Sequence, residues 1–111
     1  MKLNIYEKKK VIKTYETDTY DLLFGTVEDV ANALNLDELK TGSDVEIIKM
    51  AMNLVLTSLG TVKDLMKDIF DGITDEELRK ATVKEMAQVL VEVAQYTLAL
   101  MDIHIPKSEK N

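Results

Sequence analysis

The side chains that most often carry out chemistry in proteins are scarce in this sequence. It contains no cysteine and one histidine, His104, which follows the last predicted helix. Cysteine and histidine supply most covalent nucleophiles, general bases and zinc ligands. The residue types therefore leave only carboxylate chemistry as an enzymatic possibility. A lone histidine beside Ile103, Ile105 and Pro106 predicts no ligand site.

Clusters of acidic residues remain, and each has a structural explanation. Asp37/Glu38 and Asp75/Glu76/Glu77 stand where helices are predicted to begin, a position that the helix dipole favours for acidic side chains. Acid–base catalysis needs two carboxyl groups whose pKa values their surroundings have moved apart. Positions at helix starts and on polar faces do not provide such surroundings.

The acidic segment 68–78 has the composition of a calcium-binding loop but not its spacing. With Gly72 as the sixth loop residue, the first and twelfth would be Lys67 and Leu78, which supply no carboxylate. We therefore expect no metal, no cofactor and no enzymatic activity.

Charge is unevenly distributed along the chain. The net charge is −6, yet residues 1–17 hold five lysines against two glutamates, and residues 18–111 hold nine basic against eighteen acidic residues. Proteins that bind nucleic acid present a basic surface to the phosphates. Only Lys8, Lys9 and Lys10 offer one here, and a solvated turn explains them more simply. No nucleic-acid partner is expected.

The length of 111 residues predicts a single domain, residues 1–111. Alternating apolar and polar residues predict a β-hairpin over 2–16, followed by a helical body over 20–101 and a flexible tail over 102–111. No segment resembles a signal peptide or holds 18 consecutive apolar residues, so neither export nor membrane insertion is expected. The predicted fold class is mainly α: a small helical bundle of about five helices with an N-terminal β-hairpin.

Caps and glycines mark the expected helix boundaries. Ser43, Thr74 and Thr82 each precede a glutamate by three residues, which is the spacing of a capping box. Gly60 and Gly72 stand where a left-handed residue would end a helix. These features predict helices over about 26–39, 43–59, 61–71, 75–81 and 82–101.

The two long predicted helices carry a large apolar surface, and few other elements are available to cover it. The first has only a thin polar strip at Glu46, Lys49, Asn53 and Thr57. The second, over 82–101, repeats this pattern. Either both are central helices of a closed bundle, or another polypeptide covers part of them. Five internal methionines favour the second alternative slightly, because thioether side chains repack around varied partners.

Several long strings are similar to the tail assembly chaperones of long-tailed phages and prophages of Gram-positive bacteria. The resemblance covers about residues 2–95 and includes no catalytic motif. The matching strings are residues 2–7 (KLNIYE), 10–15 (KVIKTY), 19–29 (TYDLLFGTVED), 39–49 (LKTGSDVEIIK) and 62–79 (VKDLMKDIFDGITDEELR).

This resemblance implies a protein that is not an enzyme, acts in the host bacterial cytoplasm and is absent from the mature virion. The client in that family is the tape measure protein, a long helical chain that is kept soluble until the tail tube forms around it. The resemblance also implies a frameshifted longer form that contacts the major tail protein. We expect a homo-oligomer, with several copies on each client.

A helix of the client would then be held by apolar anchors on the two long helices. The candidate partner-binding residues are Ile47, Met50, Leu54, Val91, Leu98 and Met101.

Two other classes of function remain as alternatives. One is a small phage-encoded DNA-binding regulator that uses helices 61–71 and 75–81, or another helical adaptor. The other is a carboxylate enzyme, which would need a buried pair of acidic residues in a cleft. The acidic faces of the predicted helices disfavour the regulator.

Overall fold

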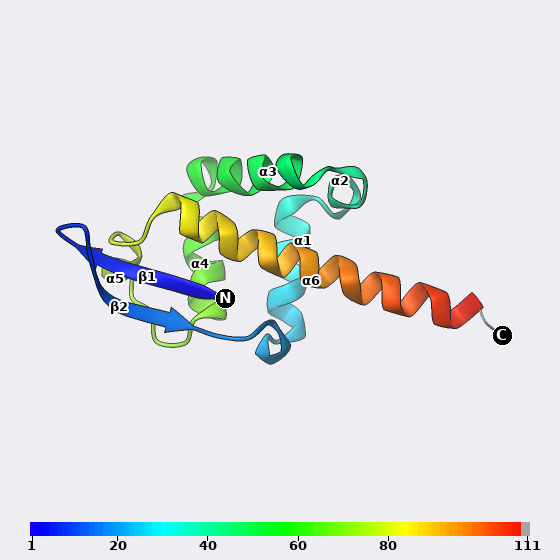
Figure 1. The fold of residues 1–111 in the computed structure, drawn as a ribbon, viewed down its shortest axis with the longest axis horizontal. Coiled ribbons are helices and arrows are strands. Elements are labelled where there is room, and N and C mark those ends of the chain that lie inside the picture. The colour runs from blue at the N-terminus through cyan, green and yellow to red at the C-terminus, as the bar shows by residue number, and fades with distance from the viewer. Residues whose placement is uncertain (110–111) are drawn as a thin grey trace.

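The computed structural model describes residues 1–109, together with the side chains of residues 1–35, 37–38 and 40–100. It is mainly helical, with a two-stranded antiparallel hairpin at the N-terminus (Figure 1), as predicted. The elements are β1 (Lys2–Glu7), β2 (Lys10–Glu16), the 3-10 helix η1 (Thr19–Asp21), α1 (Phe24–Leu34), α2 (Leu36–Thr41), α3 (Asp44–Thr57), α4 (Leu59–Ile69), α5 (Asp75–Leu78) and α6 (Val83–Glu109).

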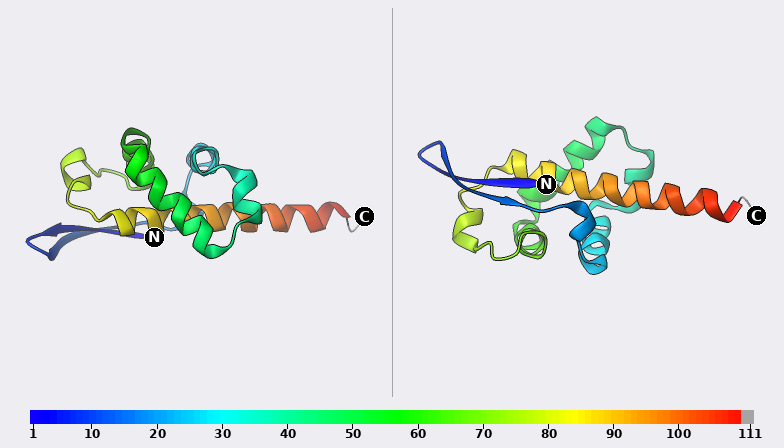
Figure 2. Two further views of the ribbon diagram at one scale, coloured as in Figure 1. Left: turned by 90° about the horizontal axis from the view of Figure 1, so that it is seen from above. Right: turned by 60° about the horizontal axis from the view of Figure 1, so that its bottom comes forward.

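Helix α6 is the element around which the others pack. It contacts β1, η1, α1, α2 and α3. Val89, Leu90, Val93 and Ala94 are completely buried, and Ala87 and Val91 are nearly so. At about 100° per residue these positions point to several sides of the helix, which is why neighbours surround it. The hairpin lies on one side of α6, and α1 and α4 lie on the other (Figure 2).

The C-terminal part of α6 extends beyond the other elements (Figure 1). At 27 residues the helix is about 40 Å long. The molecule therefore measures 56 × 25 × 21 Å, with a radius of gyration of 14.8 Å. A chain of this length folded into a sphere-like domain would have about 13 Å.

The predicted end of this helix at residue 101 is wrong, because α6 continues to Glu109 and includes residues 102–109 of the predicted tail. Residues 101–105 contain no glycine that would end the helix. Pro106 removes a single backbone donor, close to the helix end. Residues 110–111 of the predicted tail lie outside the described residues.

The hairpin turn consists of two lysines with positive φ angles. Glu7 pairs with Lys10, so the loop contains only Lys8 and Lys9, whose φ angles are 51° and 67°. A two-residue loop of this kind follows the twist of the strands and normally contains Asn-Gly. The hairpin therefore forms without the usual turn residues, and both lysines adopt a conformation that is costly for side chains with a Cβ atom.

Two glutamates at helix starts attach the hairpin to the helices. The Glu85 carboxylate, in the first turn of α6, accepts a hydrogen bond from the backbone N–H of Asn4 at 2.9 Å and another from the Tyr6 hydroxyl. Glu77, in α5, accepts one from the Tyr15 hydroxyl at 2.6 Å and pairs with Lys13 at 3.2 Å. Each strand thus bonds to one helix carboxylate, and β1 is also tied to Lys80 by the Glu7 ion pair at 3.3 Å and by a hydrogen bond from the Tyr6 backbone amide to the Lys80 carbonyl at 2.8 Å.

The capping boxes predicted at Ser43 and Thr74 are confirmed. At Thr82 only half of the box forms: the hydroxyl accepts from the Glu85 amide at 3.1 Å, while the Glu85 carboxylate reaches β1 instead.

Two predicted helix boundaries are wrong. The helix expected over 26–39 is divided into α1 and α2 by Asn35, whose φ angle is 65° and whose side chain caps α2. Gly60 lies in the first turn of α4, and Ser58 separates α3 from α4. Gly72 has a φ angle of 87°, as expected of a residue that ends a helix in the left-handed conformation.

Relief of the strained turn should stabilise the protein. We expect K8N/K9G to raise the free energy of unfolding by about 1 kcal/mol, because Asn and Gly adopt positive φ at lower cost. Urea denaturation monitored by circular dichroism measures this. K10Q, which removes a neighbouring charge outside the turn, is the control and should change stability by less than about 0.5 kcal/mol. Equal effects of the two variants would show that charge, not backbone strain, governs the turn.

The attachment of β2 should weaken in acid. The hydrogen bond from Tyr15, followed by those from Thr74 and Lys13, lowers the pKa of the Glu77 carboxyl from 4.5 to about 2. A carboxyl whose pKa is lowered on folding stabilises the folded state above its unfolded pKa, and this stabilisation is lost as the pH falls through the folded pKa. We expect the melting temperature to fall between about pH 4.5 and pH 2, and E77Q to show a smaller fall. E76Q, at the exposed neighbouring position, should behave like the wild type.

Candidate partner-binding surfaces

Metal-ligating side chains do not cluster among the described residues. Among them, no group of three or more histidine or acidic side chains could hold a metal ion. Glu77 and Glu85, the two glutamates with partners from distant strands, hold the hairpin in place. The surface depressions are open, and a representative one, between α1 and α4, has a volume of about 390 Å³. What the surface offers instead is exposed apolar side chains.

The structure places the predicted partner-binding residues mostly inward. Ile47 and Val91 are each only 4% exposed, so this structure offers a partner almost none of their surface. Met50, Leu54 and Leu98 are half-buried and pack against the core. Met101 lies in α6, but its side chain lies outside the described residues. Periodicity identified helices with two apolar sides and could not tell which side faces the core.

The outer face of α3 carries the largest exposed apolar feature that follows one helix. We call it the α3 stripe: Val45 (59% exposed), Ile48 (41%), Met52 (37%) and Leu56 (63%). At about 100° per residue, these four positions fall within an arc of about 80°. Their spacing of three, four and four residues is that of a helix face which packs against another helix.

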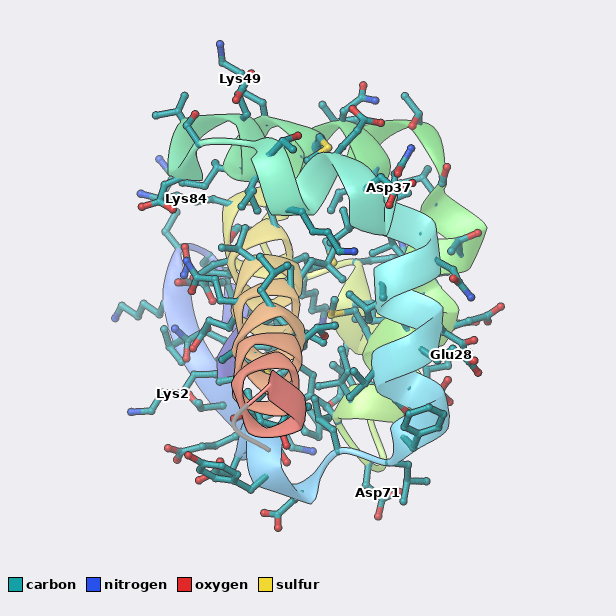
Figure 3. All side chains as sticks on the ribbon, turned by 90° about the vertical axis from the view of Figure 1, so that its right-hand side faces the viewer. Lys2, Glu28, Asp37, Lys49, Asp71 and Lys84 are labelled. Atoms are coloured by element: carbon teal, nitrogen blue, oxygen red, sulfur yellow. The ribbon has the colours of Figure 1, made fainter. Side chains whose placement is uncertain are left out.

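The neighbouring side of α3, centred about 100° around the helix from the stripe, faces the core. Ile47, Ala51 and Val55 are buried there, against α6 and α4. The polar strip that includes Lys49 and Asn53 lies on the other side of the stripe, and Lys49 points away from the molecule (Figure 3). The helix thus has a wide apolar arc, of which its own chain covers one part and leaves the stripe open.

The α3 stripe ends at a sharp corner. Leu59, the first residue of α4, is 62% exposed and stands next to the end of α3. The axes of α3 and α4 differ by 109°. Within the described residues, no single helix has the length and hydropathy needed to cross a membrane, whereas α3 and α4 taken together as a bent pair meet that requirement.

A second exposed apolar cluster lies where η1 leads into α1. Tyr20, Leu23 and Phe24 are all at least three-quarters exposed. The Tyr20 ring packs edge-on against that of Tyr96 in α6, with ring centroids 5.8 Å apart. This cluster is compact, and it does not form a stripe along one helix.

A third, smaller site is the pair Val11 and Ile12 near the hairpin turn, each about half exposed. A β-bulge between Ile5 and Tyr6 shifts the strand register beside them. Sequence reasoning assigned no role to this pair or to the Tyr20 cluster. Their apolar character is visible in the sequence, but their exposure is not.

Comparison with known proteins finds no family model, no curated protein and no solved structure that matches this chain. Its function must therefore be argued from its own surfaces.

A lysine introduced in the α3 stripe should hardly change the free energy of unfolding, whereas one on the buried face should lower it strongly. We expect L56K to change the free energy of unfolding by less than about 0.5 kcal/mol, because the lysine lies in solvent. The adjacent V55K should cost more than about 3 kcal/mol, because it buries an unpaired charge in the core. Urea denaturation of the two variants, which differ by one position, tests the assignment of the stripe. A large loss of stability in L56K would contradict it.

Proposed function

We propose that this protein is a phage tail assembly chaperone that binds helical segments of the tape measure protein and keeps them soluble during tail assembly. The observation that carries the proposal is the α3 stripe, an apolar helix face left open to solvent. The resemblance described above supports the same function. In this proposal the protein acts in the host cytoplasm and is absent from the finished virion.

The mechanism is the packing of one helix against another. α3 has 14 residues and is about 21 Å long, so it covers a similar length of a client helix. The client would contribute apolar residues at i, i+3, i+4 and i+7. Val45, Ile48, Met52 and Leu56 replace the predicted candidates Ile47 and Val91, because they are the apolar residues that a client helix can reach.

One such contact is weak. Complete burial of a large apolar side chain contributes about 1.5–3 kcal/mol, and the stripe residues are already partly buried, so four of them contribute roughly 3–6 kcal/mol. Loss of translational and rotational freedom on binding costs about 4–15 kcal/mol. Stable coating of a client therefore requires several linked copies, and this is the physical reason for a homo-oligomer.

Contact with the major tail protein, through a longer frameshifted product, belongs to the same proposal. It rests on the resemblance alone. The DNA-binding alternative receives no support from the surface, because Asp64, Asp68, Asp71 and Asp75 on and beside α4 and α5 are exposed and would repel phosphate.

Co-expression with the tape measure protein tests the function. The wild-type chain should keep the client in the soluble fraction and co-purify with it. I48K/L56K should lose at least about tenfold in co-purified client, because two lysines in the stripe would have to be desolvated on binding.

The matched control is L23K/F24K, which places two lysines in the other exposed apolar cluster and should retain the client. Circular dichroism spectra of all three proteins should agree. An insoluble client with the wild-type chain would refute the chaperone function. A soluble client that I48K/L56K still retains would refute the α3 stripe as its binding surface.

A further inference from the structure

The hairpin and the rest of the molecule carry opposite charges. Residues 1–17 hold an excess of three positive charges, and residues 18–111 an excess of nine negative charges. Lys13 and Glu7 of the hairpin form ion pairs with the body. Among the described side chains, no ion pair involves Lys8, Lys9 or Lys10, and all three are exposed. Together with Val11 and Ile12 they form a basic and apolar end of the hairpin, here called the hairpin tip.

The backbone conformation of the hairpin tip lowers its local stability. Lys8 and Lys9 both have positive φ angles, in a loop where Asn-Gly would be less strained. The tip also projects away from the helices (Figure 1). Strained residues on a projecting, charged turn are typical of a contact site rather than of a structural connection.

A groove of opposite charge lies between α1 and α4. Its lining includes Ala33, the buried Leu65 and the polar Asn32 and Thr61, and its rim carries Asp29, Asp64 and Asp68, all exposed. Of the two lysines of α4, Lys67 interacts electrostatically with Asp64, but neither lies beside Asp68. At about 100° per residue, Lys63 and Lys67 lie about 100° or more around the helix from Asp68, and Lys67 pairs with Asp75 at 2.6 Å.

A tip cannot reach the groove of its own chain. The hairpin and α1 lie on opposite sides of α6 (Figure 2), and Figure 3 shows Lys2 of the hairpin and Glu28 of α1 at opposite edges of the molecule. A tip that fills such a groove must therefore belong to another copy.

We propose that the hairpin tip of one copy docks in the α1–α4 groove of the next. Lys8, Lys9 and Lys10 then face the three aspartates of the rim, and Val11 and Ile12 cover the apolar part of the lining. Because the two surfaces differ, the contact is head-to-tail and each added copy leaves one tip and one groove open. The product is an open chain of subunits whose length rises with concentration.

This assembly would repeat the α3 stripe at regular intervals, which is how several weak contacts could hold one long helical client. That consequence rests on the proposed chaperone function. The assembly itself does not, because it involves only copies of this chain.

Sedimentation velocity tests the assembly. We expect the wild-type sedimentation coefficient to rise with concentration at about 50 mM NaCl, and much less at about 500 mM, because salt screens the lysine–aspartate contacts. The tip variant K8N/K9G/K10Q should associate at least about tenfold more weakly. Since K8N/K9G removes turn strain, this loss cannot be attributed to unfolding.

The control K40Q/K49Q/K84Q removes three exposed lysines elsewhere and should associate like the wild type. A wild-type chain that is monomeric at low salt, or a tip variant that associates as strongly as the wild type, would overturn the proposal.

A mixing experiment distinguishes head-to-tail docking from other contacts. On its own, the groove variant D29N/D64N/D68N should be monomeric. The control D21N/D37N/E76Q, which removes three acidic groups elsewhere, should associate like the wild type. Mixed with the tip variant, the groove variant supplies an intact tip and its partner an intact groove, so the mixture should form 1:1 dimers that grow no further. A mixture that stays monomeric, or that forms long chains, would refute the arrangement. Because the mixture contains only copies of this chain, its result is distinguishable from that of the client co-purification.

Discussion

The burial of α6 on several sides at once is the constraint on which the remaining structure depends. Val89, Leu90 and Val93 leave no surface to solvent, and β1, α1 and α3, which contact this helix, all contribute buried apolar residues. A chain of 111 residues has few elements with which to surround such a helix. Once they are arranged around α6, none remains to cover the outer side of α3. The open apolar stripe is thus a consequence of how the central helix is enclosed.

The hairpin closes one side of α6 through polar contacts as well as packing. Leu3 and Ile5 are buried beneath it. The Glu77 carboxylate both completes the capping box of α5 and holds β2, whereas the Glu85 carboxylate, at the start of α6, bonds to β1. Because they hold only the inner part of the hairpin, the lysine-rich turn remains outside the body. The positive charge of residues 1–17 is therefore separated in space, as it is in the sequence, from the negative charge of the helices.

The open α3 stripe and the charged hairpin tip both fit the proposed assembly of several copies. An apolar stripe on one helix offers a client only a weak contact, and repetition is the usual physical way to strengthen it without new contacts. A molecule with a positive projection on one side and a negative groove on the other has the means to line up copies of itself.

The features that the sequence predicted correctly depend on neighbours along the chain. The hairpin over 2–16 follows from alternation, and the capping boxes at Ser43 and Thr74 follow from hydrogen bonds that span three residues. The thin polar strip of α3 is likewise readable, since it depends only on helical periodicity. The expectation of surplus apolar surface holds for α3. It does not hold for α6 up to Thr97, because several elements together cover that helix.

Tertiary structure decided the rest. Ile47 and Val45 are both apolar residues of one helix, and only the position of α6 places the first inside and the second outside. Glu85 has the spacing of a capping box, yet its carboxylate accepts hydrogen bonds from donors of β1 instead of from the Thr82 backbone. The sequence thus determined which helices are apolar on more than one side, because periodicity is a local property. Which of those sides is exposed to solvent depends on which distant elements pack against the helix, and that packing is defined only in the folded chain.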